Sequence, residues 1–197
     1  MRNIFKNITL RSAISAAILL FTAAYIHGAR TKSWVIMAVM ALGFYKPTVP
    51  QLKPGEKLIA APAFVVKDIN GKPTDILQQK GKVVFVNFWA TWCPPCLAEL
   101  SSVNDLYLKV KDNPNIVFLS VDVDNNLPKS SLFLQKKGYV FPVYGGEMRG
   151  LPHTFYPEII PTTVVIDKKG LIVFSHINRA DYNDEKFYNF LNELSHQ

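Results

Sequence analysis

The chain contains little cysteine: two residues among 197, at positions 93 and 96. There is no second C-x-x-C pair, and the four histidines lack the spacing of metal ligands: His27, His153, His176 and His196. A structural zinc site needs four ligands, which this pattern does not supply. A structural disulfide across so short a loop would restrict the unfolded chain little. Zinc binding, copper binding and a structural bridge remain as alternatives to a redox role.

The two cysteines stand where an apolar run meets a helical pattern. The run Val83–Trp89 leads into Cys93-Pro94-Pro95-Cys96, and apolar residues recur at helical spacing from Pro95 onward. A C-x-x-C pair at a strand-to-helix junction is typical of a thiol–disulfide redox centre. The helix dipole would stabilise the first thiolate, and the second thiol, one turn later, would resolve a mixed disulfide.

Positive charge is concentrated near the N-terminus. The net charge is +7; residues 1–57 hold eight Lys or Arg against Glu56 alone, whereas residues 58–197 hold 14 basic and 14 acidic residues. The excess flanks apolar segments, which is typical of membrane topology. We therefore expect no binding to nucleic acid.

Two uncharged apolar stretches lie in this basic region, at residues 12–29 and 33–45. As helices they would measure about 27 Å and about 20 Å, so only the first matches the hydrocarbon thickness. No signal-peptidase site follows it. We predict an uncleaved anchor within residues 1–45, a cytoplasmic N-terminus, one effective span, and a domain on the outer, periplasmic side of the inner membrane. A second span at 33–45 would return the domain to the cytoplasm.

The rest of the chain divides into a linker, residues 46–59, rich in proline, and a domain, residues 60–197. Asn70-Gly71 predicts a turn, Gly138 predicts a helix C-cap, and residues 145–160 should be irregular. The expected strands are 64–66, 83–89, 116–121, 140–144, 162–167 and 171–175; the expected helices are 95–110, 129–137 and 184–194, with a helical turn at 74–79. This order predicts an α/β fold with a mixed central sheet and helices on both faces.

Two motifs together resemble a known family. The run Val86–Cys96, with Ile160-Pro161-Thr162-Thr163 and Ile166–Gly170 after it, is similar to thioredoxin-like proteins, most of all to the TlpA/ResA group of membrane-anchored thiol–disulfide oxidoreductases. The resemblance covers about Ala60 to Leu194. It implies a thioredoxin fold and an enzyme that works through its dithiol without a further cofactor or metal.

The resemblance also implies residue roles. Cys93 becomes the exposed attacking thiolate and Cys96 the buried resolving thiol. Pro161 becomes a cis-proline beside them, and Ile160 offers its backbone to a substrate chain in strand-like pairing. Substrate contacts are implied for four residues: Trp92, Pro94, Ile160 and Pro161.

Other residues near the motif have two interpretations. Glu99, three residues after Cys96, matches a glutamate that assists proton transfer in this group, but it also suits a carboxylate held by the helix dipole. Asn87 stands where cytosolic thioredoxins carry a buried aspartate, so that relay is absent. Trp89 and Trp92 fit packing and surface shaping better than chemistry.

The segment 145–153 matches no substrate loop of the group. His153 and Glu158 are candidates to face the dithiol, although a lone loop histidine is more often solvated.

The leading hypothesis is a monomeric enzyme that reduces disulfides of exported proteins, such as apocytochrome c, with electrons from a membrane-borne donor. The direction depends on which redox form is stabilised, so a disulfide-inserting oxidase is the alternative within the enzyme class. A copper carrier that uses Cys93, Cys96 and a histidine is the alternative outside it.

Overall fold

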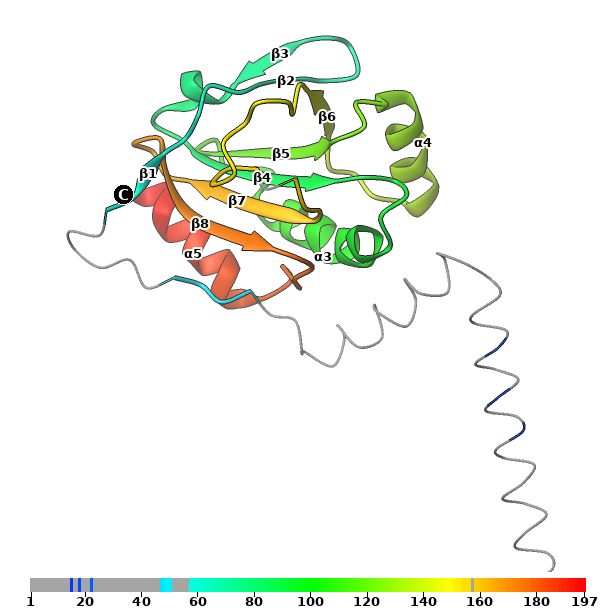
Figure 1. Cartoon of the computed structure of the whole chain (residues 1–197). Coiled ribbons are helices and arrows are strands. Elements are labelled where there is room, and N and C mark those ends of the chain that lie inside the picture. The colour runs from blue at the N-terminus through cyan, green and yellow to red at the C-terminus, as the bar shows by residue number, and fades with distance from the viewer. Residues whose placement is uncertain (1–14, 16–17, 19–21, 23–46, 51–56, 157) are drawn as a thin grey trace, which may run out of the picture.

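The computed structural model describes residues 15, 18, 22, 47–50, 57–156 and 158–197 (Figure 1). The domain follows the order β1 (Ile59–Ala60), β2 (Val65–Lys67), β3 (Pro73–Asp75), η1 (Ile76–Gln79, a 3₁₀ helix), β4 (Val83–Trp89), α3 (Pro94–Val110), β5 (Ile116–Asp122), α4 (Leu127–Lys137), β6 (Val143–Gly146), β7 (Thr162–Ile166), β8 (Leu171–Ile177) and α5 (Glu185–His196).

The strands form one mixed sheet in the order β1-β8-β7-β4-β5-β6-β2-β3. Strand β4 pairs parallel with β5 and antiparallel with β7, with Phe88 opposite Thr162. The start of β7 therefore meets the end of β4. This pairing brings the turn before β7 to the same end of the sheet at which α3 begins.

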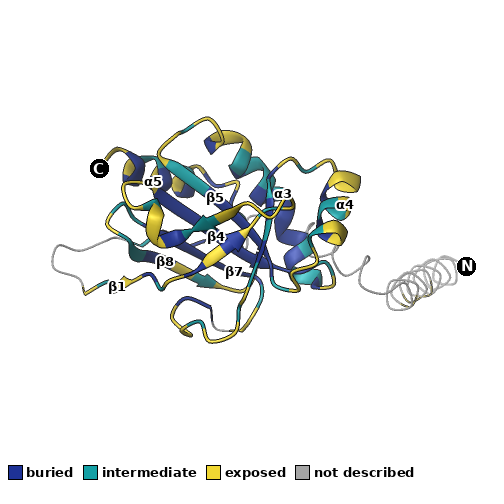
Figure 2. Ribbon diagram, turned by 90° about the horizontal axis from the view of Figure 1, so that it is seen from above, coloured by how far each residue is buried: buried dark blue, intermediate teal, exposed yellow. Residues whose placement is uncertain are grey.

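The two faces of β4 belong to different cores, because alternate residues of a strand point to opposite faces. Phe85 and Trp89 join a core to which α3, α4 and α5 contribute side chains. Val86 and Phe88 join a second core with Ile76 of η1. Figure 2 shows the buried residues gathered in the middle of the domain, with exposed residues around its rim.

The prediction of an α/β fold with a mixed sheet is confirmed, but the covering of its faces differs from the expectation. All three α-helices contribute to one core, whereas the other is closed by η1 and by the segment after β6, which has no helix or strand among its described residues 147–156 and 158–160 and supplies Phe155 and Tyr156. This segment holds Gly150, Pro152 and Pro157 and no helical repeat, so its side chains cover the face without an α-helix.

Most element boundaries agree with the sequence pattern. Strand β4 has its predicted limits, and α3 begins one residue earlier than predicted. Gly138 caps α4 in the left-handed conformation, with φ 72°. Strand β6 lies about three residues later than predicted, and β1 carried too short a pattern to be recognised.

The predicted anchor, residues 1–45, lies outside the described residues except for positions 15, 18 and 22. Within the described part of the chain we find no helix with the length and hydropathy of a membrane span. Of the predicted linker, Pro47 is buried, and Val49 and Leu58 pack against the core to which α5 contributes side chains. These parts of the linker are thus attached to the domain.

Candidate functional site

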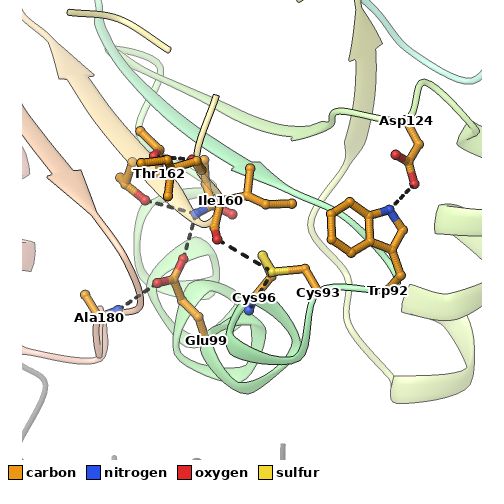
Figure 3. The surroundings of a disulfide bond; sticks show 11 residues. Trp92, Cys93, Cys96, Glu99, Asp124, Ile160, Thr162 and Ala180 are labelled. Carbon is orange, nitrogen blue, oxygen red and sulfur yellow. Dashed lines mark hydrogen bonds between the residues drawn. A yellow bond between two sulfur atoms is a disulfide. The ribbon is translucent and has the colours of Figure 1, made fainter. Parts of the chain in front are cut away.

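The two cysteines lie at the N-terminus of α3 and are joined by a disulfide (Figure 3). Cys93 is the N-cap residue, and its sulfur accepts a hydrogen bond from the backbone N–H of Cys96 at 3.3 Å. Pro94 and Pro95 occupy the first helical positions, where a missing N–H costs nothing. The N–H of Cys96 and the positive end of the helix would therefore stabilise a thiolate on Cys93.

Both cysteines are shielded from solvent in this oxidised state. Cys93 is 3% exposed and Cys96 is 0% exposed. The expectation of an exposed Cys93 is therefore wrong for the oxidised form, because the disulfide and the turn before β7 cover its sulfur. Cys93 nevertheless keeps the outer position of the pair.

The turn before β7 lies against Cys93. The Ile160–Pro161 bond is cis, as the resemblance implied. The carbonyl oxygen of Ile160 lies 3.8 Å from the Cys93 sulfur, and the Thr162 hydroxyl donates to the Ile159 carbonyl at 2.6 Å. Ile159 is half exposed. The substrate contacts assigned to Ile160 and Pro161 stay a prediction, and the backbone beside Cys93 supports it.

Trp92 forms the other border of the site and is 58% exposed. Its indole N–H donates to Asp124 Oδ2 at 2.7 Å (Figure 3). Trp89, in contrast, is fully buried in the core, in agreement with a packing role. Sequence reasoning missed Asp124, because nothing in the pattern connects residues 32 positions apart.

Glu99 is buried within the domain, at 1% exposure, and points from α3 toward Ala180 (Figure 3). Its Oε1 accepts a hydrogen bond from Asn87 Nδ2 at 2.7 Å, and its Oε2 accepts one from the Ala180 N–H at 2.7 Å. Burial raises the pKa of Glu99 from 4.5 to about 8, although the two hydrogen bonds act in the opposite direction. Glu99 is therefore no solvated helix-dipole carboxylate.

Two further residues near Glu99 were missed by sequence reasoning. Ala180 contributes only its backbone N–H, and Tyr182 is fully buried beside the carboxyl group. Burial, and then the charge of Glu99, raises the pKa of Tyr182 well above its usual value. No local pattern marks either residue, because both reach the site through the loop between β8 and α5.

His153 and Glu158 are both exposed, in the segment 147–160. Burial raises the pKa of the Tyr156 phenol, and the nearby charge of Glu158 raises it further. Among the described residues, no three His, Cys, Asp or Glu side chains are grouped as metal ligands.

The chain is similar to known redox proteins. It is 37% identical over 113 residues to the thiol-disulfide oxidoreductase ResA of Bacillus thuringiensis (strain Al Hakam), a match that spans 57% of this chain and 65% of that protein, less than two thirds of its length. A thiol:disulfide interchange protein of the thioredoxin family from Chlorobium tepidum TLS superposes with a TM-score of 0.58 at 26% identity, over 72% of this chain and 99% of that structure. StoA from Bacillus subtilis superposes with a TM-score of 0.53 at 25% identity, over 67% of this chain and 98% of that structure.

These superpositions confirm the thioredoxin-like fold. The chain also matches the AhpC/TSA family over residues 59–175, which include β4, the dithiol and the Ile160–Pro161 turn. Because this match covers more than half of the sequence, the chain belongs to the AhpC/TSA family.

Proposed function

We propose that this chain is a thiol–disulfide oxidoreductase that reduces disulfides of other proteins through Cys93 and Cys96. The observation that carries the proposal is the placement of the pair at the N-terminus of α3, with the Ile160 carbonyl beside Cys93. A substrate chain that pairs with the backbone of Ile160 would bring its own disulfide to this sulfur. The name of the ResA relative supports the same reaction class.

The reaction begins from the reduced pair. The Cys93 thiolate attacks one sulfur of a substrate disulfide, which forms a mixed disulfide and releases the second substrate sulfur as a thiolate. Cys96 then loses its proton and attacks the Cys93 sulfur, and the first substrate sulfur leaves as a thiolate. The substrate has gained two electrons, and the chain carries the Cys93–Cys96 disulfide.

Glu99 is the proton acceptor in the second step. It lies one helical turn after Cys96 on the same side of α3, since residues three apart are neighbours on a helix. With a pKa of about 8, the carboxyl group exchanges protons readily near neutral pH. A carboxylate with an ordinary pKa would be a much weaker base for a thiol proton.

The reductive direction needs a donor that restores the dithiol. A membrane-borne dithiol protein would supply it if residues 12–29 anchor the chain and the domain lies outside the cytoplasm, where exported cysteine proteins such as apocytochromes are substrates. The oxidase alternative differs only in the reduction potential of the Cys93–Cys96 pair. A potential of about −250 mV supports a reductase, whereas one of about −120 mV supports an oxidase.

The decisive experiment is substrate trapping with the full-length chain in cells. Cys96→Ala leaves Cys93 unable to release its partner, so covalent adducts that disappear on reduction are expected. The matched control is the double variant Cys93→Ala, Cys96→Ala, which should trap nothing. Absence of reducible adducts at normal levels of the Cys96→Ala protein would contradict the proposal.

Topology is tested separately with a reporter fused after Gln197 that is active only outside the cytoplasm. An active reporter is expected. An inactive reporter on an intact, membrane-associated fusion would show that the domain faces the cytoplasm.

A further inference from the structure

The side chain of Asn87 uses its hydrogen-bonding groups unequally. Its Nδ2 group donates twice, to Glu99 Oε1 at 2.7 Å and to Thr163 Oγ1 at 2.9 Å. Its Oδ1 atom is buried and has no hydrogen-bond partner among the described residues. A buried acceptor without a partner costs free energy. The amide is thus held with its donors toward Glu99, in spite of that cost.

The sheet register explains why the amide is placed there. Asn87 in β4 is opposite Thr163 in β7, so their side chains lie next to each other on one face of the sheet. This is the face that α3 covers, and Glu99 meets Asn87 from the helix. Thr163 is two residues beyond Pro161. Asn87 therefore connects the carboxyl group on α3 with the strand that begins at the cis-proline.

The chemistry of the contact distinguishes the two forms of Glu99. A carboxylate only accepts hydrogen bonds, whereas a carboxylic acid must also donate one. The Asn87 amide and the Ala180 N–H both donate, so this arrangement is complementary to the anion. A charge-assisted bond of this kind is stronger than a neutral one.

We infer that Asn87 is a positioning residue that orients the Glu99 carboxyl group and selectively stabilises its charged form. Burial favours the protonated form of Glu99, in which the carboxyl group cannot act as a base. The two donors oppose this effect and increase the fraction of carboxylate, the form that can accept a proton from the resolving thiol. The inference rests on the proposed function for its catalytic use, but the interaction itself exists without turnover.

The groups that contact Glu99 or its hydrogen-bond partner Asn87 come from four elements. Asn87 in β4 and Thr163 in β7 are neutral, and the loop before α5 contributes the Ala180 N–H and the phenol of Tyr182. Cys96 lies one turn earlier on α3 and does not titrate while the disulfide is intact. In oxidised protein, Glu99 is therefore the group of this cluster that changes charge around neutral pH.

The test is a carboxyl titration of Glu99 by ¹³C NMR in the oxidised, full-length protein, with the signal assigned by its loss in Glu99→Gln. Asn87→Leu removes the donor at similar volume, and Asn87→Asp replaces it with an acidic acceptor. Both variants should move the Glu99 midpoint upward by about one to two pH units, a change of about 10- to 100-fold in proton affinity. Thr163→Val, which leaves the Asn87–Glu99 contact in place, is the matched control and should change the midpoint much less.

The same variants should shift the pH profile of thiol exchange in the same direction. A Glu99 midpoint that is unchanged in folded Asn87→Leu and Asn87→Asp proteins overturns the inference and leaves the proposed function intact. A shifted midpoint with no thiol exchange in the wild type confirms the inference and overturns the proposed function.

Discussion

Two buried carboxyl groups, Asp122 and Glu99, are each only 1% exposed, yet they are held by different kinds of partner. Asp122 ends β5 and accepts three hydrogen bonds, from the N–H of Asp124 at 3.1 Å, the N–H of Asn126 at 3.0 Å and the hydroxyl of Ser130 at 2.6 Å. All three donors lie within eight residues of it along the chain. Asp122 thus organises the turn between β5 and α4.

Glu99 accepts from only two partners, and both lie farther away in sequence: Asn87 by 12 positions and Ala180 by 81. Its burial is less fully compensated, and its pKa is raised to about 8. The comparison indicates that a buried carboxylate surrounded by local donors stabilises structure. One with few donors, supplied by the tertiary fold, is suited to exchange protons.

The largest expected effect is on the structural member of the pair. Asp122→Ala removes three hydrogen bonds and should lower the free energy of unfolding by about 3 kcal/mol, measured by urea denaturation of the oxidised protein. Ser130→Ala removes one donor and should cost about 1 kcal/mol. A loss of well under 1 kcal/mol in Asp122→Ala would mean that the turn does not depend on this carboxylate.

The next effect concerns the pH dependence of stability. The folded protein binds the Glu99 proton more tightly than the unfolded chain, because the pKa rises from 4.5 to about 8 on folding. The free energy of unfolding should therefore decrease as pH rises from about 4.5 to about 8. In Glu99→Gln this decrease in the free energy of unfolding should be absent. The pH profile of the thiol-exchange rate should likewise lose the part that depends on the ionisation of Glu99. Equal slopes in wild type and variant would show that Glu99 does not titrate in this range.

A third prediction extends the comparison to the cysteines, where the stabilising donor is local. The Cys96 N–H and the start of α3 act on Cys93, so in reduced protein Cys93 should be alkylated about 10-fold or more faster than Cys96. Mass spectrometry of partly alkylated protein gives the ratio. Faster modification of Cys96 would reverse the assigned roles.

The smallest effect is expected at the border of the site. Asp124→Asn keeps the turn and an acceptor for the Trp92 indole but removes the charge, so stability should change by no more than about 0.5 kcal/mol. The fluorescence of exposed Trp92 should change, with Trp92→Phe identifying its share of the signal. A large loss of stability would contradict this prediction and show that Asp124, like Asp122, stabilises the structure.

The comparison also explains which residues the sequence could predict. The apolar run Val83–Trp89, the prolines at the start of α3 and the glycine after α4 act on their own neighbours, so the pattern predicted their elements well. The cysteine pair was recognisable for the same reason, since a spacing of three on a helix fixes their proximity. The cis form of Pro161 was predicted only through the resemblance to a family.

Local sequence therefore determined the strand, the helix start and the dithiol, because these depend on hydrophobic periodicity, capping and spacing within one or two turns. Tertiary structure alone decided the burial of Glu99, its contact with Asn87 and the N–H of Ala180, and the bond between Trp92 and Asp124. These depend on which strands pair and on where a distant loop returns to the sheet. A carboxylate acquires its unusual pKa only when that assembly removes it from water.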